Sequence, residues 1–278
     1  MFSINCKGKL FSWSEPLVMG IINATPDSFV AGHLSAGVEG IVQLAESMIN
    51  DGADILDIGG QSTRPGSERV GAAEELERVL PVISAIHQRW PDVLLSIDTY
   101  HSTVAKAAAE AGASIINDIS SGDMDPDMLA VVAQLRTPYI CMHMKGTPET
   151  MQAEPHYDNV VTGVLDYLAV KIQRCHEAGI NDVIIDPGFG FGKTIRHNFQ
   201  LLHGLSALGI TGKPVLAGLS RKSTIYKTLG VTAAEALNGT TVLNTIALQN
   251  GASVLRVHDV KAAKEAVTLF TAYKKALQ

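Results

Sequence analysis

Eight short apolar segments alternate with longer amphipathic segments along this chain, and this alternation restricts the folds that the chain can adopt. The apolar segments are rich in Ile, Val and Leu, as strands of a parallel sheet buried on both faces are. They lie at residues 17–23, 55–60, 94–99, 114–120, 139–144, 182–188, 214–220 and 254–259. The intervening segments have helical periodicity, as in AAEELERVLPVISAIHQRW at 72–90. The order of these segments predicts consecutive parallel βα units.

Eight such units in 278 residues match a (β/α)8 barrel, which usually has about 250 residues. No Pro/Ser-rich linker or run of like charges divides the chain, so one domain over residues 1–278 is preferred to two. The predicted fold class is therefore α/β, a TIM barrel. The segment before the first apolar run, residues 1–16, is expected to form a short N-terminal β-hairpin that closes the bottom of the barrel.

An open, doubly wound sheet is the second possible architecture, and the glycine patterns argue against it. Such a sheet would carry a glycine fingerprint after its first strand, where this chain has IINATPDSF at 21–29. The segment DPGFGFGKT at 186–194 is rich in glycine, but Pro187 occupies the first glycine position of a phosphate-binding P-loop. Lys193 likewise occupies the last glycine position of GxGxxG.

Composition and charge exclude several classes of function. The chain is 46% hydrophobic and 18% charged, as in an ordinary globular protein. A formal net charge of -6 disfavours a general nucleic-acid or membrane-surface binder, since either would need a basic excess. The three cysteines form no CxxC pair, and the first fifteen residues do not resemble a signal peptide. We therefore expect a cytoplasmic protein that binds neither nucleic acid nor membrane.

Polar residues end every predicted strand, and in such a barrel these ends form the active face. Structural barrels also end strands in Ser, Gly and Asp for turns and helix caps, but polar ends on every strand exceed that need. The residues are Asn23, Gly59, Asp98, Asn117, His143, Asp186, Lys222 just beyond its strand, Arg256 and His258. The sequence thus predicts a polar site at the barrel mouth.

The residue types at these ends indicate the ligands. Asp98 and Asp186 could be turn formers, but with Asn117 they also suit a planar heterocycle, since carboxylates accept paired N–H groups and an amide both donates and accepts. Arg256 and His258 lie two residues apart and share one strand face, so an anion is the expected partner.

Two further residues and one loop are candidates for the site. His143 can be read either as a satisfied core histidine or as a site residue. Asn23 offers a neutral oxygen that suits a phosphate-bound Mg²⁺, which takes few protein ligands. The loop GGQSTRPGSERV at 59–70 combines glycines, hydroxyls and an arginine, which favours a mobile loop carrying binding groups over a plain connector.

Eight segments of the chain resemble the dihydropteroate synthase family, in the family's order. They are MGIINATPDSF (19–29), DIGGQSTRPG (57–66), SIDT (96–99), NDIS (117–120), MHMKGTPETMQ (142–152), DPGFGFGKT (186–194), GLSRKS (218–223) and RVHDV (256–260). The family joins 4-aminobenzoate to the pyrophosphate ester of hydroxymethyl-dihydropterin, which gives dihydropteroate and pyrophosphate. The resemblance implies that activity for this chain, without nucleic acid or membrane partners and with a homodimeric assembly.

The resemblance also implies roles for individual residues. The pterin would be held by Asp98, Asn117, Asp186 and Lys222, and Met142 and Gly218 would be further substrate-binding residues. Arg256 and His258 would hold the pyrophosphate, with Asn23 meeting its Mg²⁺ and Thr63 and Arg64 contributing from the loop. Pro65, Phe191, Lys222 and Ser223 would line the aminobenzoate slot. Asp98, Asp186, Lys222 and Arg256 would act in catalysis by stabilising the separating pterin cation and pyrophosphate anion.

Two alternatives remain open from the sequence: a pterin-dependent methyltransferase and a non-catalytic or slowed pterin-binding paralogue. The chain departs from the family at one place, because Ala31 stands where the family commonly has an aspartate. A carboxylate there could face the transient cation, so a slowed synthase is one expectation from this difference.

Overall fold

The computed structural model describes residues 1–25, 37–61, 69–147, 151 and 155–276. Eight parallel strands within these ranges form one sheet in the order β8-β7-β6-β5-β4-β3-β10-β9. The strands are β3 (Leu17–Asn23), β4 (Ile55–Gly59), β5 (Leu94–Asp98), β6 (Ile115–Asp118), β7 (Tyr139–Met142), β8 (Val183–Asp186), β9 (Leu216–Ala217) and β10 (Val254–Val257). A parallel bridge between Ile185 and Val215 joins the two ends of the sheet, so the strands close into a barrel.

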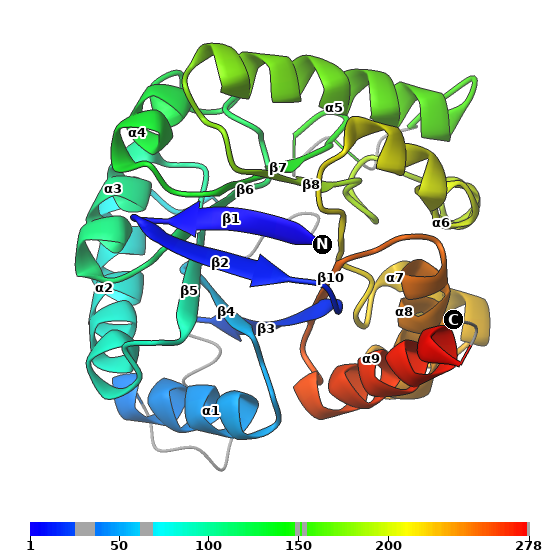
Figure 1. Ribbon diagram of the computed structural model, residues 1–278, viewed down its shortest axis with the longest axis horizontal. Helices are drawn as coiled ribbons and strands as arrows, with labels where there is room; N and C mark the ends of the chain where they lie inside the picture. The colour runs from blue at the N-terminus through cyan, green and yellow to red at the C-terminus, as the bar shows by residue number, and fades with distance from the viewer. Residues whose placement is uncertain (26–36, 62–68, 148–150, 152–154, 277–278) are drawn as a thin grey trace.

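Helices surround this barrel, and each strand is followed by at least one of them (Figure 1). They are α1 (Val38–Asn50), α2 (Ala72–Arg89), α3 (Ser102–Ala111), α4 (Met128–Leu135), α5 (Val160–Glu177), α6 (Ile195–His203), the 3₁₀ helix η2 (Leu205–Thr211), α7 (Ser223–Leu229), α8 (Leu237–Gln249) and α9 (Val260–Lys275). Among the described helices, none is long and apolar enough to cross a membrane. The predicted (β/α)8 architecture is confirmed.

The strands are shorter at their carboxyl ends than the apolar runs suggested. The run at 182–188 yields only Val183–Asp186, and the run at 214–220 yields only Leu216–Ala217. At the start of the second run, Pro214 has no N–H to donate, although its carbonyl accepts a hydrogen bond from Ile185 N at 2.9 Å. The residues beyond the strand ends belong to loops at the mouth, which frees them from the sheet for other contacts.

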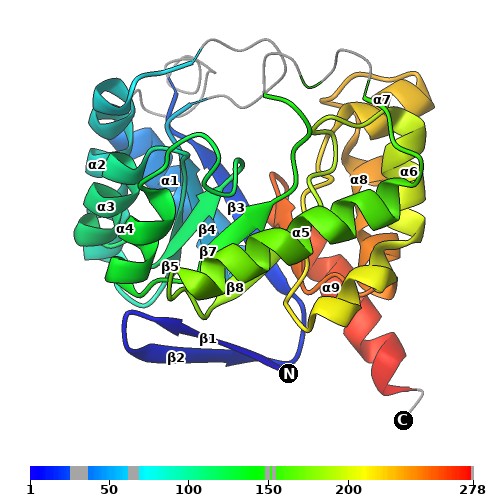
Figure 2. The ribbon, with the colours of Figure 1, turned by 90° about the horizontal axis from the view of Figure 1, so that it is seen from above.

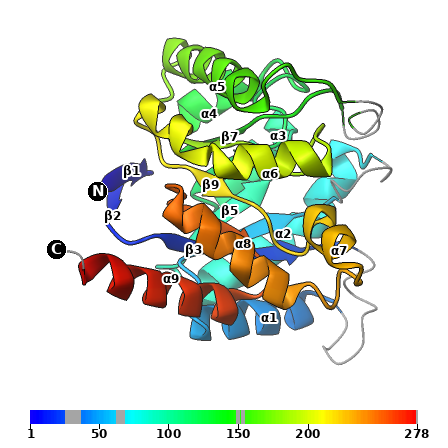
Figure 3. The ribbon, with the colours of Figure 1, turned by 90° about the vertical axis from the view of Figure 1, so that its right-hand side faces the viewer.

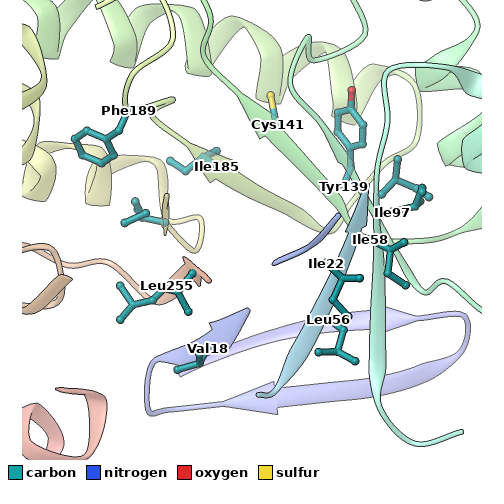
Figure 4. Packing of buried hydrophobic residues seen from close by; sticks show 14 of the residues in the cluster. Val18, Ile22, Leu56, Ile58, Ile97, Tyr139, Cys141, Ile185, Phe189 and Leu255 are labelled. Atoms are coloured by element: carbon teal, nitrogen blue, oxygen red, sulfur yellow. The ribbon is translucent and has the colours of Figure 1, made fainter. Parts of the chain in front are cut away.

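Side-chain alternation divides the core into two parts. Val18, Leu56 and Leu255 point outward and pack with the helices in one large cluster (Figure 4). Their neighbours Met19, Ile55 and Val254 point inward and form a second cluster, which fills the lower half of the barrel. The barrel is therefore a packed core below its mouth, as eight-stranded barrels are.

An antiparallel hairpin, β1 (Phe2–Cys6) and β2 (Lys9–Trp13), lies across the bottom of the barrel (Figure 2). Ile4, Cys6 and Trp13 are buried and belong to the same cluster as the lower barrel interior. Because alternate residues face opposite sides of a strand, the opposite face of β2 carries the exposed residues Leu10 and Ser12. The hairpin closes the barrel bottom, as predicted from residues 1–16.

Trp13→Ala is expected to lower the free energy of unfolding by about 3–5 kcal/mol, because it removes a large buried side chain from this closure. Trp13 is 6% exposed, whereas Leu10 of the same strand is 70% exposed. Leu10→Ala is the matched control and is expected to change stability by less than about 0.5 kcal/mol. Urea unfolding of the two variants checks this, and equal losses would show that the hairpin does not seal the core.

Candidate active site at the barrel mouth

The inward-facing positions at the carboxyl ends of the strands bring the predicted polar residues together. Asp98 lies opposite Asn117 on the neighbouring strand, and Met142 lies opposite Asp186. All four side chains are almost buried, with exposures between 3% and 8%. These residues are far apart in the sequence, and the parallel register alone places them at one end of the barrel.

Arg256 on β10 bridges two carboxylates inside the barrel. Its Nε donates to Asp57 Oδ2 at 2.6 Å, and its Nη2 donates to Asp98 Oδ2 at 2.6 Å. Asn117 Nδ2 also donates to Asp57 Oδ2, at 3.0 Å. Burial opposes the charge of the guanidinium, but the carboxylates of Asp57 and Asp98 outweigh it and raise the pKa of Arg256. The charge of Arg256 is therefore compensated within the protein, before any anion binds.

Asp57 was not identified from the sequence, although one signal was present. It interrupts the otherwise apolar strand β4 and shares the inward face with Ile55 and Gly59. The residue is completely buried, and its second oxygen, Oδ1, has no hydrogen-bond partner among the described residues. A buried carboxylate with an unused oxygen costs stability, so its presence points to a task at the mouth.

Charges at the mouth shift the pKa values of its acids and its amine. Burial raises the pKa of Asp98 to about 7; Arg256 counteracts this rise, and Asp57 adds to it. Burial also raises the pKa of Asp186, against the opposing charge of Lys222. The pKa of Lys222 is lowered to about 8, again chiefly by burial. Both carboxyl groups can thus gain a proton more readily than exposed acids can.

Lys222 comes from the loop after β9 and crosses the mouth. Its Nζ donates to the carbonyl of Phe189 and lies 4.7 Å from the centroid of the Phe191 ring. A Cβ atom on Gly218 would lie 3.8 Å from Lys222 Nζ and 4.0 Å from Asp186 Oδ2, so the glycine borders both charged groups. Ser223 follows at the first turn of α7 and is partly buried. The structure thus gathers Phe191, Lys222 and Ser223 on one side of the mouth.

His258 lies just beyond β10, two residues after Arg256. Its Nδ1 is 3.0 Å from Ser220 Oγ, and its backbone N–H donates to the same hydroxyl at 3.2 Å. Asp259 next to it makes a two-pronged ion pair with Arg221, which ties the loop after β9 to the loop after β10. The imidazole is therefore held at the edge of the mouth beside Arg256.

His143 is a satisfied core histidine, which settles the two readings of this residue. It is 4% exposed, its Nδ1 accepts from Lys193 Nζ at 2.8 Å, and its ring meets the Tyr167 ring edge-on at 4.8 Å. Burial, with the nearby Lys193, lowers the pKa of His143 to about 3. The ring is thus neutral and fixed.

Asn23 lies at the exposed end of β3, opposite Gly59, so its amide oxygen is accessible at the rim. No group of three or more His, Cys, Asp or Glu side chains is arranged for a metal ion within the described ranges. One neutral oxygen fits a Mg²⁺ that takes most of its ligands from a pyrophosphate and water. Thr63, Arg64, Pro65 and Ala31 lie outside the described residues.

Glu75 on α2 forms a second buried acidic group behind the end of β4. Its Oε2 accepts from Thr99 Oγ1 at 3.0 Å and from Gln61 Nε2 at 3.2 Å, and Gln61 Oε1 accepts from Tyr100 Oη at 2.8 Å. A Cβ atom on Gly60 would lie only 2.8 Å from Glu75 Cγ, so glycine is needed where β4 meets α2. This network fixes Gln61 at the start of the predicted binding loop.

Comparison with known proteins places this geometry in a family. Residues 19–258 match the family described as pterin binding enzyme. Curated dihydropteroate synthases from Escherichia coli K12 and Streptococcus pyogenes are 44% and 43% identical; the alignments cover 96% and 95% of this chain and 94% and 98% of theirs.

Solved structures agree with these relatives. The Yersinia pestis dihydropteroate synthase, in a sulfonamide drug complex, superimposes with a TM-score of 0.93 at 42% identity, over 99% of this chain and all of its own. The Xanthomonas albilineans enzyme in complex with 7,8-dihydropteroate has a TM-score of 0.88 at 41% identity, with 98% of each chain covered. The same enzyme with 4-aminobenzoic acid has a TM-score of 0.91, at 42% identity and with the same coverage.

Glu75→Gln is expected to flatten the pH dependence of stability. Burial raises the pKa of Glu75 from 4.5 to about 7, so between these values the native protein holds a proton that the unfolded chain has released. Stability therefore falls as pH rises through this window, for this group by on the order of 3 kcal/mol. Urea unfolding at pH 5 and pH 8 measures the fall, which should shrink in Glu75→Gln but not in the exposed neighbour Glu74→Gln. An unchanged fall in Glu75→Gln would contradict the assignment.

Proposed function

This chain belongs to the dihydropteroate synthases, within the family of pterin-binding enzymes, and we propose how its own residues join 4-aminobenzoate to a hydroxymethyl-dihydropterin pyrophosphate. The observation that carries the proposal is the cluster of buried polar groups at the mouth. Asp98, Asn117 and Asp186 face inward above an apolar barrel floor, with Lys222 and Arg256 beside them. Such a site suits a flat, polar heterocycle with a charged substituent.

The pterin ring occupies this cluster. Its amino and ring N–H groups donate to Asp186, while Asn117 supplies both a donor and an acceptor to the ring edge. Asp186 Oδ1 already accepts from Gly188 N at 2.7 Å, which fixes the direction of the carboxylate. Met142 and Gly218 are buried on the same inner face and border the ring.

The pyrophosphate lies above Arg256 and His258. Arg256 uses Nε and Nη2 for the two aspartates, and its remaining N–H groups can donate to phosphate oxygens. The family resemblance adds Thr63 and Arg64, which lie outside the described residues, as further expected ligands of this anion. Asn23 would hold the pyrophosphate's Mg²⁺, and such an ion would supply positive charge that offsets part of the charge of the leaving anion.

The reaction breaks the bond between the pterin methylene carbon and the pyrophosphate oxygen. The bonding electrons leave with pyrophosphate, and the amino nitrogen of aminobenzoate then bonds to the carbon and releases a proton. The carboxylates of Asp98 and Asp186 stabilise the developing pterin cation, while Arg256 and His258 stabilise the departing anion. Lys222 lies beside both carboxylates and positions the ring. No protein nucleophile takes part.

Aminobenzoate enters a slot lined by Phe191, Lys222 and Ser223, to which the family resemblance adds Pro65 from outside the described residues. Its ring packs against Phe191, and its carboxylate lies near Lys222 and Ser223. We expect sulfonamides to compete with aminobenzoate for this slot, and the sulfonamide drug complex of the Yersinia pestis enzyme supports this expectation.

Pyrophosphate release with the pterin ester and aminobenzoate tests the proposal. Turnover that requires both substrates and yields dihydropteroate is the expected result. A non-catalytic pterin-binding protein would bind the ester without release, and a pterin-dependent methyltransferase would use neither the ester nor aminobenzoate. If Ala31 slows the chemical step, Ala31→Asp should raise kcat in the same assay.

Arg256→Gln is expected to weaken binding of the pterin pyrophosphate far more than binding of hydroxymethyl-dihydropterin alone. Losing one partner of a charge-assisted contact costs about 2–5 kcal/mol, which is roughly thirtyfold or more in affinity. Titration calorimetry with both ligands measures the difference. Equal losses for the two would place the pyrophosphate elsewhere.

The homodimer is proposed to form through the outer face of α8, which Figure 3 shows beside α6, α7 and α9. The helix LNGTTVLNTIALQ carries no charged residue, even on its exposed side. Its outer face includes Leu237, Val242 and Ile246, with exposures of 39%, 50% and 38%. Leu229 at the end of α7 is 55% exposed. An uncharged, partly apolar surface on a helical pair suits pairing with its own copy across a twofold axis.

The cytoplasmic location stays a prediction from the sequence.

Val242→Asp is expected to convert such a dimer into a monomer, because it places a charge at the centre of the proposed contact. Leu269→Asp on α9, where Leu269 is 71% exposed, is the matched control and should leave the assembly unchanged. Sedimentation velocity at several protein concentrations distinguishes these results. A monomeric parent protein, or a dimer that survives Val242→Asp, would exclude this interface.

A further inference from the structure

The loop between β8 and α6 is held by a buried lysine that has no role in the reaction described above. Lys193 is 2% exposed. Its Nζ donates to the carbonyls of Gly188 and Phe191 at 2.9 and 3.0 Å, and to His143 Nδ1 at 2.8 Å. These three acceptors match the three N–H groups of an ammonium. Among the described residues, no carboxylate forms an ion pair with it.

In the backbone of this loop, Phe191 N donates to the carbonyl of Gly188 at 3.1 Å and closes a turn, but the glycines of the loop favour no single conformation. Gly188, Gly190 and Gly192 have φ values of 66°, 84° and 61°, in the left-handed region that glycine enters readily. A Cβ atom on Gly188 would lie 1.9 Å from the carbonyl oxygen of His143, so the loop also passes very close to β7. A flexible glycine loop in this position needs side chains to fix it.

Side chains do fix it, and Lys193 makes two of the contacts. Tyr157 Oη donates to the carbonyl of Gly192 at 2.9 Å, and Asn198 Oδ1 accepts from the N–H of Gly190 at 2.8 Å. Lys193 draws together the carbonyls at both ends of the Gly188–Phe191 turn. It therefore sets how the two phenylalanines between these glycines are presented.

Both phenylalanines act on Lys222. The carbonyl of Phe189 accepts from Lys222 Nζ, and the Phe191 ring lies under the same nitrogen. We propose that Lys193 is a positioning residue for the aminobenzoate slot: by holding the Gly188–Phe191 turn, it places the Phe191 ring and the Lys222 ammonium for the aromatic acid. This inference rests on the proposed function, since the slot belongs to it.

Lys193→Met tests this inference, because methionine keeps the length of the buried chain and removes the three donors. The KM for 4-aminobenzoate is expected to rise by about tenfold or more, since a wall of the slot is loosened. The inhibition constant of sulfanilamide should rise in parallel. Affinity for the pterin pyrophosphate, by calorimetry without aminobenzoate, is expected to fall clearly less than affinity for aminobenzoate. This loop fixes Asp186 through Gly188 N, but Asp98 and Asn117 are not held by it.

Lys171→Met is the matched control. Lys171 on α5 is also buried, at 4% exposure. Its Nζ donates to the carbonyl of Ser121 at 3.2 Å and forms an ion pair with Asp123, outside the barrel interior. Both variants are expected to lose thermal stability, but only Lys193→Met should raise the KM for aminobenzoate. Should Lys193→Met fail to fold, Lys193→Gln keeps donors for two of the acceptors and carries the same comparison, with a smaller rise in KM.

Two results would overturn the inference. One is a KM in Lys193→Met no higher than in Lys171→Met, which would make Lys193 a purely structural residue. The other is an equal loss of affinity for both substrates, which would mean general damage to the mouth. Absence of dihydropteroate formation by the unmodified chain would instead count against the proposed function, so the two failures are distinguishable.

Discussion

The ion-pair bridge from Asp57 through Arg256 to Asp98 is the interaction on which the mouth of this barrel depends. Asp57 and Asp98 come from neighbouring strands, and Arg256 reaches them from β10. Each of these charges would be costly to bury alone, so the three are tolerable only as a group. The same carboxylate of Asp57 also holds Asn117. Removing one member therefore leaves unpaired charge in the barrel and disturbs residues that face the substrate.

The bridge also changes how the pyrophosphate is recognised. Two cations on one strand suggested an anion as their missing partner, but Arg256 already has two carboxylate partners in this structure. In the proposed mechanism, an arriving pyrophosphate would bind a guanidinium that is already held in place, so less orientational freedom would be lost on binding than with an unheld side chain. The nearby acids would compete with the anion for the same positive charge, which would favour its release after the reaction.

The alternation of apolar and amphipathic segments was sufficient to predict the barrel and its hairpin. The place of each residue at a strand end was sufficient to predict that Asp98, Asn117, Asp186 and Arg256 face inward, because the register of a closed barrel fixes which side chains point inside. They could not predict the contacts among these residues. Asp57 lies in the middle of a strand, where an acid without a visible partner looks like an irregularity, and its partner is almost two hundred residues away. In the sequence, Lys193 stands out only as a mismatch to phosphate-loop patterns. Its proposed positioning role depends on backbone carbonyl groups, and no sequence pattern shows where these lie.

Strand β4 shows how one short segment serves the whole barrel. Ile55 faces the apolar lower interior, Asp57 fixes the guanidinium above it, and Gly59 lies beside Asn23 and Asp98 at the rim. Within the five residues of β4, the inward-facing side chains thus change from the apolar Ile55 to the charged Asp57 and then to Gly59, which has no side chain. Because the lower layer is closed by the hairpin and packed with apolar side chains, it can support the costly charged layer above it. The stability of the barrel bottom is therefore a physical requirement for the polar mouth, and the two ends are coupled through a single strand.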